Sequence, residues 1–161
     1  MLTATGATVG SPINVGGTPD YIAVSPDGSQ ALVTTWPGRS DLVPVNSPTL
    51  TAGSPIPIQA PLGIAIAPDG RTAWVTGGTN DDTLYPVNMA THQVGQPVTV
   101  DPSDSAASVA ISPDGQTAYV VSQFTGLIPV DWPPRRWVAP SAFPPASRPR
   151  WISVPTAPRP T

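Results

Sequence analysis

The sequence predicts an all-β fold, a partial β-propeller of about three four-stranded blades followed by an irregular C-terminal tail. The main observation is a turn that occurs three times, at intervals of 42 and then 45 residues. Its copies are Ser25-Pro26-Asp27-Gly28, Ala67-Pro68-Asp69-Gly70 and Ser112-Pro113-Asp114-Gly115. Such a period indicates one supersecondary unit used repeatedly, and a unit of four strands in this length is typical of a propeller blade.

Each turn has the chemistry of a type I β-turn that joins two strands. Proline presets φ at the second position, and glycine closes the turn. The flanking segments are short, rich in β-branched and aromatic residues, and alternate small with large side chains, which favours strands. They are residues 21–24, 63–66 and 108–111 before the turns, and 31–34, 73–76 and 118–121 after them.

The rest of the unit repeats as well. A third strand is predicted to end at Pro44-Val45-Asn46, Pro86-Val87-Asn88 and Pro129-Val130-Asp131, and a Gly-x-Pro step at Gly10, Gly53 and Gly95 precedes a fourth strand. We therefore expect β-propeller repeats over residues 1–131. Residues 1–15 would be the end of a preceding blade, and residues 16–58, 59–100 and 101–131 would be blades.

The repeated unit resembles a known family. Ile22-Ala23-Val24-Ser25-Pro26-Asp27-Gly28 with Ala31-Leu32-Val33-Thr34 is similar to the YVTN-type β-propeller repeat, as are residues 109–120 and 73–77. The resemblance covers roughly residues 1–131 and extends to surface-layer and lactonase-type propellers. It implies a secreted or cell-surface protein that binds something. The asparagine that usually follows the Tyr-Val-Thr stretch is absent, because Thr35, Gly77 and Ser122 stand near its place.

Residues 132–161 change character, with five of the seven Arg, three of the five Trp and nine Pro. Three interpretations are open: a disordered Pro/Arg tail, a basic tail for nucleic acid or anionic surfaces, and a shift of reading frame. We favour the frame shift, because shifted codons permit a new Gly-x-Pro step and a new Asp-Gly turn about 42 residues after Asp114.

Three blades would leave two open faces and unpaired edges. These would meet either the missing blades of a longer chain or other copies.

Composition narrows the function classes. The chain has no Glu, Lys or Cys, and Gly and Pro number 14 and 24 of 161 residues, so helices, disulfides and thiolate chemistry are not expected. No run of 18 apolar residues predicts a membrane span, and residues 1–5 lack the pattern of a signal peptide. With a pI near 4.7, the folded part is not expected to bind nucleic acid.

Three polar features of the sequence are candidate sites. His92 is the only histidine, and a metal ligand or general base needs partners, so we interpret it as an exposed loop residue. Asn80-Asp81-Asp82 could offer oxygens to Ca²⁺, but the spacing fits no EF-hand loop and favours a polar interstrand loop. The connection Asp101-Pro102-Ser103-Asp104-Ser105 would lie on a face where ligands dock in propellers, but turn chemistry explains it.

The remaining candidates have structural interpretations. Asp27, Asp69 and Asp114 recur identically, which favours turn acids over catalytic acids. Trp74 and Tyr119 are predicted to pack between blades, and Trp36 to be exposed. There is no Gly-x-Ser-x-Gly elbow and no phosphate-binding loop with lysine. No catalytic, cofactor-binding or metal-binding residue is therefore assigned, and no cofactor is expected.

The sequence favours a non-enzymatic binding or scaffold module, a fragment of a larger secreted or cell-surface repeat protein. Its partner would be a protein or small molecule on a propeller face. The alternative is a fragment of a lactonase-type propeller hydrolase. That function would need several acidic or histidine side chains at one channel mouth, supplied partly by missing blades.

Overall fold

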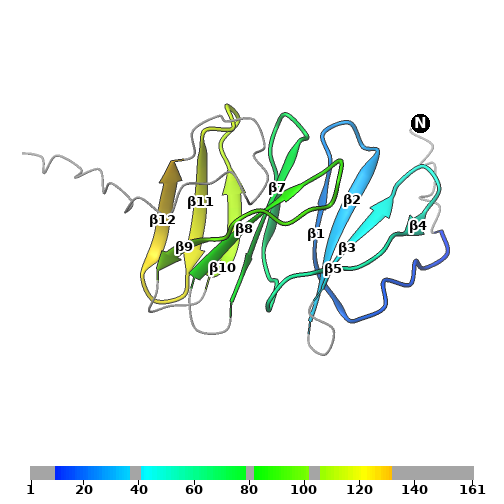
Figure 1. Cartoon of the computed structure of the whole chain (residues 1–161), viewed down its shortest axis with the longest axis horizontal. Helices are drawn as coiled ribbons and strands as arrows, with labels where there is room; N and C mark the ends of the chain where they lie inside the picture. The colour runs from blue at the N-terminus through cyan, green and yellow to red at the C-terminus, as the bar shows by residue number, and fades with distance from the viewer. Residues whose placement is uncertain (1–9, 37–40, 79–81, 102–105, 132–161) are drawn as a thin grey trace, which may run out of the picture.

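A computed structural model describes residues 10–36, 41–78, 82–101 and 106–131 (Figure 1). Over these ranges the chain forms strands, turns and connecting segments, and no helix. No membrane-spanning helix is therefore found in the described part of the chain. The predicted tail, residues 132–161, lies outside the described residues. The strands are β1 (Pro19–Val24), β2 (Gln30–Thr35), β3 (Asp41–Asn46), β4 (Thr51–Ala52), β5 (Ile56–Pro57), β6 (Ile64–Ile66), β7 (Thr72–Gly77), β8 (Asp82–Asn88), β9 (Val98–Asp101), β10 (Ala106–Ile111), β11 (Thr117–Ser122) and β12 (Gly126–Asp131).

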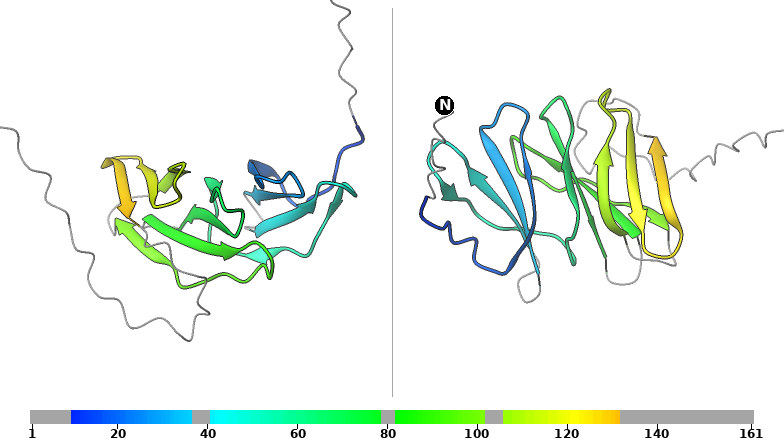
Figure 2. Two further views of the ribbon diagram at one scale, coloured as in Figure 1. Left: turned by 90° about the horizontal axis from the view of Figure 1, so that it is seen from above. Right: turned by 180° about the vertical axis from the view of Figure 1, so that it is seen from behind.

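The strands form three antiparallel sheets, which we call A, B and C in chain order. Sheet A has the order β1-β2-β3-β4, with β5 also paired to β3; sheet B is β6-β7-β8-β9, and sheet C is β10-β11-β12. The sheets lie side by side in a row rather than in a closed ring (Figure 2). Contacts of β1 with β6, and of β10 with β6 and β7, join neighbouring sheets. This up-and-down architecture confirms the predicted partial propeller.

The three repeated turns have one backbone geometry. In each, the glycine N–H donates to the carbonyl of the first turn residue at 2.8 Å, as from Gly28 to Ser25. Gly28, Gly70 and Gly115 have φ of 69°, 69° and 72°, a region that glycine enters without steric cost. The third strands β3, β8 and β12 end at Asn46, Asn88 and Asp131, as predicted.

The aspartate of the first turn accepts several hydrogen bonds. The Ser25 hydroxyl donates to Asp27 at 2.6 Å, and the N–H of Ser29 donates at 3.0 Å. Together with the Ser29 hydroxyl, these two donors lower the pKa of Asp27 to about 2. The Ser112 hydroxyl and the Gln116 N–H likewise lower the pKa of Asp114. These carboxylates thus organise the turns, which is the structural role that their repetition predicted.

These turns make stability depend on pH in acid. The folded pKa of Asp27 lies below its usual value of 3.8, so its contribution is present above pH 3.8 and is lost as the pH falls toward 2. We expect the urea midpoint to fall in this window, and to fall less in a variant that combines Asp27→Asn with Asp114→Asn. Urea titrations at several pH values would measure, for each protein, how steeply the urea midpoint falls with pH. Equal slopes in the two proteins would contradict this assignment.

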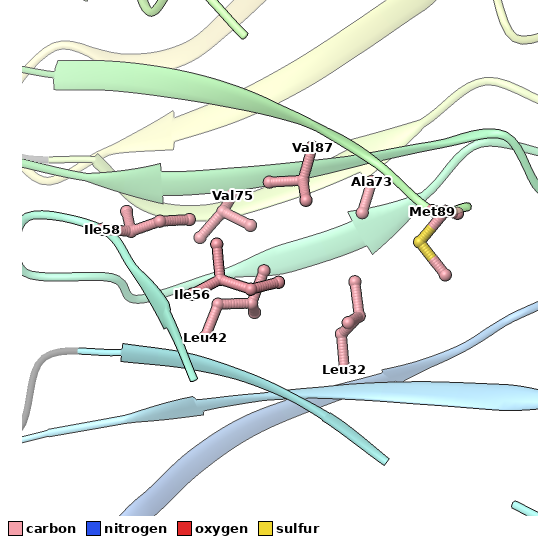
Figure 3. Packing of buried hydrophobic residues seen from close by; sticks show 8 residues of the cluster. All are labelled: Leu32, Leu42, Ile56, Ile58, Ala73, Val75, Val87 and Met89. Atoms are coloured by element: carbon pink, nitrogen blue, oxygen red, sulfur yellow. The ribbon is translucent and has the colours of Figure 1, made fainter. Parts of the chain in front are cut away.

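A hydrophobic core fills the space between sheets A and B. Leu32 and Leu42 from sheet A pack against Val75 and Val87 from sheet B, and all four side chains are fully buried (Figure 3). A second cluster between sheets B and C contains Trp74, Leu84, Ala106, Val109, Ala118 and Val120. The repeat thus buries its apolar residues between sheets, and each sheet depends on its neighbours for its core.

Leu50 is strained in the loop before β4. Its φ is 54°, in the left-handed region that asparagine and glycine tolerate better than leucine, and its side chain is 61% exposed. We expect Leu50→Asn to raise the free energy of unfolding by roughly 0.5 to 1 kcal/mol, because it relieves strain without removing a core contact. Thermal unfolding would show a higher Tm. An unchanged or lower Tm would contradict the expectation.

Candidate functional site

Equivalent positions of the repeat lie on equivalent faces of the sheets. We call the face of a sheet toward the preceding sheet its leading face, and the opposite one its trailing face. Between sheets A and B, the trailing residues Leu32 and Leu42 cover the leading residues Ala73, Val75 and Val87. Between sheets B and C, Trp74 and Leu84 cover Ala118 and Val120 in the same way. The two interfaces are therefore copies of one packing arrangement.

The leading face of sheet A exposes residues that the repeat buries elsewhere. Ile22 is 64% exposed and Val24 is 57% exposed. Their equivalents in sheet B, Ile64 and Ile66, are half-buried against sheet A. In sheet C the equivalent of Ile22 is Val109, which is 7% exposed. The leading face of sheet A thus has the chemistry of a blade interface, and no sheet formed by the described residues covers it.

The trailing face of sheet C also exposes residues whose equivalents in sheets A and B are buried. Leu127 is 63% exposed, whereas its equivalents Leu42 and Leu84 are both 0% exposed. Tyr119 is 39% exposed and stands where Leu32 and Trp74 are buried. The expected packing of Tyr119 between blades is therefore wrong for this chain, because no described sheet follows sheet C.

Residues 10–15 partly cover the leading face of sheet A. Ile13 and Val15 pack against Ala31, Val33 and Val45. Beside them an open hollow of about 410 Å³ is lined by these apolar side chains together with Tyr21 and Ile22. In the repeat, Ile13 and Val15 correspond to Ile56 and Ile58, which lie in the core between sheets A and B. The segment therefore lies where the outer strand of a preceding blade would.

The two acidic segments singled out from the sequence have one described residue each, Asp82 and Asp101, and both lie in sheet B. Asn80, Asp81 and residues 102–105 lie outside the described residues, but the backbone of Asp82 pairs with that of Asp101. Among the described residues, no group of three His, Asp or Glu side chains could hold a metal ion. The strand register, which the sequence does not show, thus pairs Asp82 with Asp101.

His92 has a structural contact between blades. It is half-buried, with φ of 58°, and its Nε2 lies 2.8 Å from Nε2 of Gln30 at the start of β2. The side-chain amide nitrogen of Gln30 can only donate a hydrogen bond, so Gln30 is the donor and Nε2 of His92 is the acceptor. The histidine therefore links the loop after β8 to sheet A, which differs from the freely exposed loop residue expected from the sequence.

The burial of Trp74 and of the positions near the expected asparagine is explained by packing. Trp74 is 5% exposed in the core between sheets B and C, as predicted, and Trp36 is 41% exposed, also as predicted. Thr35 and Ser122 are buried, and Gly77 approaches the carbonyls of Gln59 and Ala60 so closely that a side chain would not fit. The described surface is thus distinguished by its two open apolar blade faces.

These features define the chain as a part of a β-propeller, and comparisons with solved structures agree. No protein-family model and no curated protein matches the chain. Hydrazine synthase of Kuenenia stuttgartiensis is similar with a TM-score of 0.64 and 24% identity, over 81% of this chain and 36% of that one. The β-propeller domain of Myceliophteria thermophila Cps50 (Swd1) is similar with a TM-score of 0.61 and 8% identity, over 72% and 36%.

A third similar structure is a putative 6-phosphogluconolactonase from Bacteroides uniformis, with a TM-score of 0.51 and 17% identity, over 64% of this chain and 32% of that one. At these identities the likeness shows the propeller fold alone. The chain spans about a third of the length of these propellers. The YVTN-type resemblance stays a prediction.

Proposed function

We propose that the chain is a non-enzymatic β-propeller module for binding and scaffolding, of the YVTN type, within a larger secreted or cell-surface repeat protein. The observation that supports this proposal is the chemistry of the two outer faces. Both present the apolar positions that the repeat buries between sheets, as the contrast between Leu127 and Leu84 shows. A module with such faces is suited to extension by further propeller blades.

Sequencing of the genomic locus tests the larger-protein part of this proposal. We expect further Pro-Asp-Gly turns at intervals of about 42 residues upstream of Met1, and downstream of Asp131 in a shifted frame. Flanking DNA without such turns would contradict extension of the repeat. Antibody labelling of intact cells would test surface location, with permeabilised cells as the control.

A hydrolase of the lactonase type is the second candidate, favoured by the likeness to the 6-phosphogluconolactonase-like propeller. Incubation of the full chain, and of a version extended by any flanking blades, with a sugar lactone would separate the two candidates. The scaffold proposal expects acid release no faster than in buffer. Enzyme-dependent acid release from the extended protein would overturn it in favour of the hydrolase.

A further inference from the structure

Sheet C has no outer strand among the described residues. Its order is β10-β11-β12, whereas sheet B continues from β8 to β9 and sheet A from β3 to β4 and β5. β12 is the repeat equivalent of β3 and β8. Its outer edge therefore offers the backbone groups to which the repeat elsewhere adds another strand.

Residues 10–15 have the sequence of that missing strand. Gly10-Ser11-Pro12-Ile13-Asn14-Val15 corresponds to Gly53-Ser54-Pro55-Ile56-Pro57-Ile58 and to Gly95-Gln96-Pro97-Val98-Thr99-Val100. Both of these outer segments use the same pairing. The glycine N–H donates to a proline carbonyl at 2.7 Å, from Gly53 to Pro44 and from Gly95 to Pro86.

The register of the two outer segments is also the same. Leu42 pairs with Ile56 in sheet A, and Leu84 pairs with Val98 in sheet B. Applied to sheet C, this rule pairs Leu127 with Ile13 and directs the N–H of Gly10 to the carbonyl of Pro129. Residues 10–15 form no strand in their own chain, so their backbone is available for this pairing.

One chain cannot make this pairing with itself in the arrangement observed. Residues 10–15 lie on sheet A at one end of the row, and β12 lies at the other end (Figure 1). Ile13 and Val15 already cover Ala31, Val33 and Val45. This is the place that an outer strand takes against the next blade, as Ile56 and Ile58 do against sheet B.

We infer that in this 161-residue chain, taken without flanking blades, a second copy of the chain covers both open faces, docked head to tail. The trailing face of sheet C covers the leading face of sheet A in the second copy, and residues 10–15 of that copy become the outer strand of sheet C. Two copies bring six sheets, within the four to eight that closed propellers use. A head-to-tail interface of this kind can close into a ring. The inference rests on the assembly role proposed above and names its partner.

The first test blocks one face at a time. The full chain is expected to migrate in sedimentation velocity as a dimer of about 33 kDa, twice its 16.5 kDa. Ile22→Asp on the leading face and Leu127→Asp on the trailing face should each give a monomer. We expect each dissociation constant to rise roughly 100-fold or more, because docking would bury an unpaired carboxylate. Ala90→Asp, at an exposed position of the loop that follows β8 in the middle sheet, is the control and should remain dimeric.

Mixing the two blocked variants distinguishes head-to-tail docking from other arrangements. Each retains the face that the other lacks, so the mixture should form one heterodimer although neither variant associates alone. Heterodimer formation would also prove that both variants are folded. A monomeric wild-type chain, a Leu127→Asp variant that still dimerises, or a mixture that stays monomeric while both variants keep the wild-type β-sheet circular dichroism would overturn the inference.

A disulfide test checks the strand register without blocking either face. The chain has no cysteine, so introduced thiols have no competitors. Strand partners lie at Cα separations of roughly 4.5 to 5.5 Å, within the range that disulfides span. A mixture of Ile13→Cys and Leu127→Cys should therefore oxidise to a covalent heterodimer. A mixture of Ala90→Cys and Leu127→Cys is the control, and cross-linking no greater than in this control would overturn the pairing.

The outcomes separate this inference from the proposed function. Failure of association or of cross-linking would overturn the second copy as partner and leave the scaffold role to flanking blades. Lactone hydrolysis would overturn the scaffold role and leave the docking of copies unchanged.

Discussion

Leu84→Ala is expected to destabilise the chain by about 2 to 5 kcal/mol, which is the usual cost of removing a buried leucine side chain. Leu84 is 0% exposed and lies in the cluster with Trp74, Val109 and Val120 between sheets B and C. Its loss would leave a cavity at an interface on which both sheets depend. Urea unfolding followed by tryptophan fluorescence at low protein concentration would measure the change.

Leu127→Ala is the matched control, because the same residue type stands at the same position of the repeat. Leu127 is 63% exposed, so its truncation should change the free energy of unfolding of the monomer by no more than about 0.5 kcal/mol. In the head-to-tail dimer the same variant should weaken association. Equal losses for Leu84→Ala and Leu127→Ala in the monomer would show that sheet C is covered in solution by something other than a second copy.

Most of the fold follows from local sequence. The Pro-Asp-Gly turns predict their own hydrogen bonds and positive φ, and β-branched runs beside them predict β2, β7 and β11. These features depend on residues close together in the chain, where proline and glycine decide the backbone. The repeat spacing then gives the propeller architecture, since each unit needs a neighbour to bury its apolar face.

Burial could not be predicted from local sequence. Leu84 and Leu127 occupy the same place in closely similar segments, and only the presence of a following sheet separates them. The expectation for Tyr119 failed for the same reason. Ile22 and Val24 could have been identified as open-face residues by aligning the repeats and asking which interface is missing.

The contacts of the polar candidate residues could not be predicted, because they join residues far apart in the sequence. The contact of His92 with Gln30 joins residues 62 positions apart, and the pairing of Asp82 with Asp101 follows from the register of β8 and β9. The family resemblance supplied turns and core strands, which fix a fold but carry no chemistry of a site.

Gly63 is the residue whose role sequence analysis missed most clearly, because the sequence identifies it only as the start of a strand. A Cβ added at Gly63 would lie 2.5 Å from Cα of Ser108 and 3.0 Å from the carbonyl oxygen of Ala107. These are backbone atoms of β10 in the next sheet, so no side-chain rotation can make room. The glycine therefore allows the inner strands of sheets B and C to approach backbone to backbone.

We expect Gly63→Ala to lower the free energy of unfolding by about 1 to 3 kcal/mol, the usual cost of overpacking, through separation of sheets B and C. Gly10→Ala is the matched control at low protein concentration, because nothing lies within 4 Å of its added Cβ in the single chain, and there it should be neutral or slightly stabilising. Urea unfolding would give both values, and hydrogen exchange should show faster exchange in β10 of Gly63→Ala alone. If Gly63→Ala is as stable as Gly10→Ala, the two inner strands have room to move apart at no cost. The close approach at Gly63 would then not be what sets the spacing between these blades.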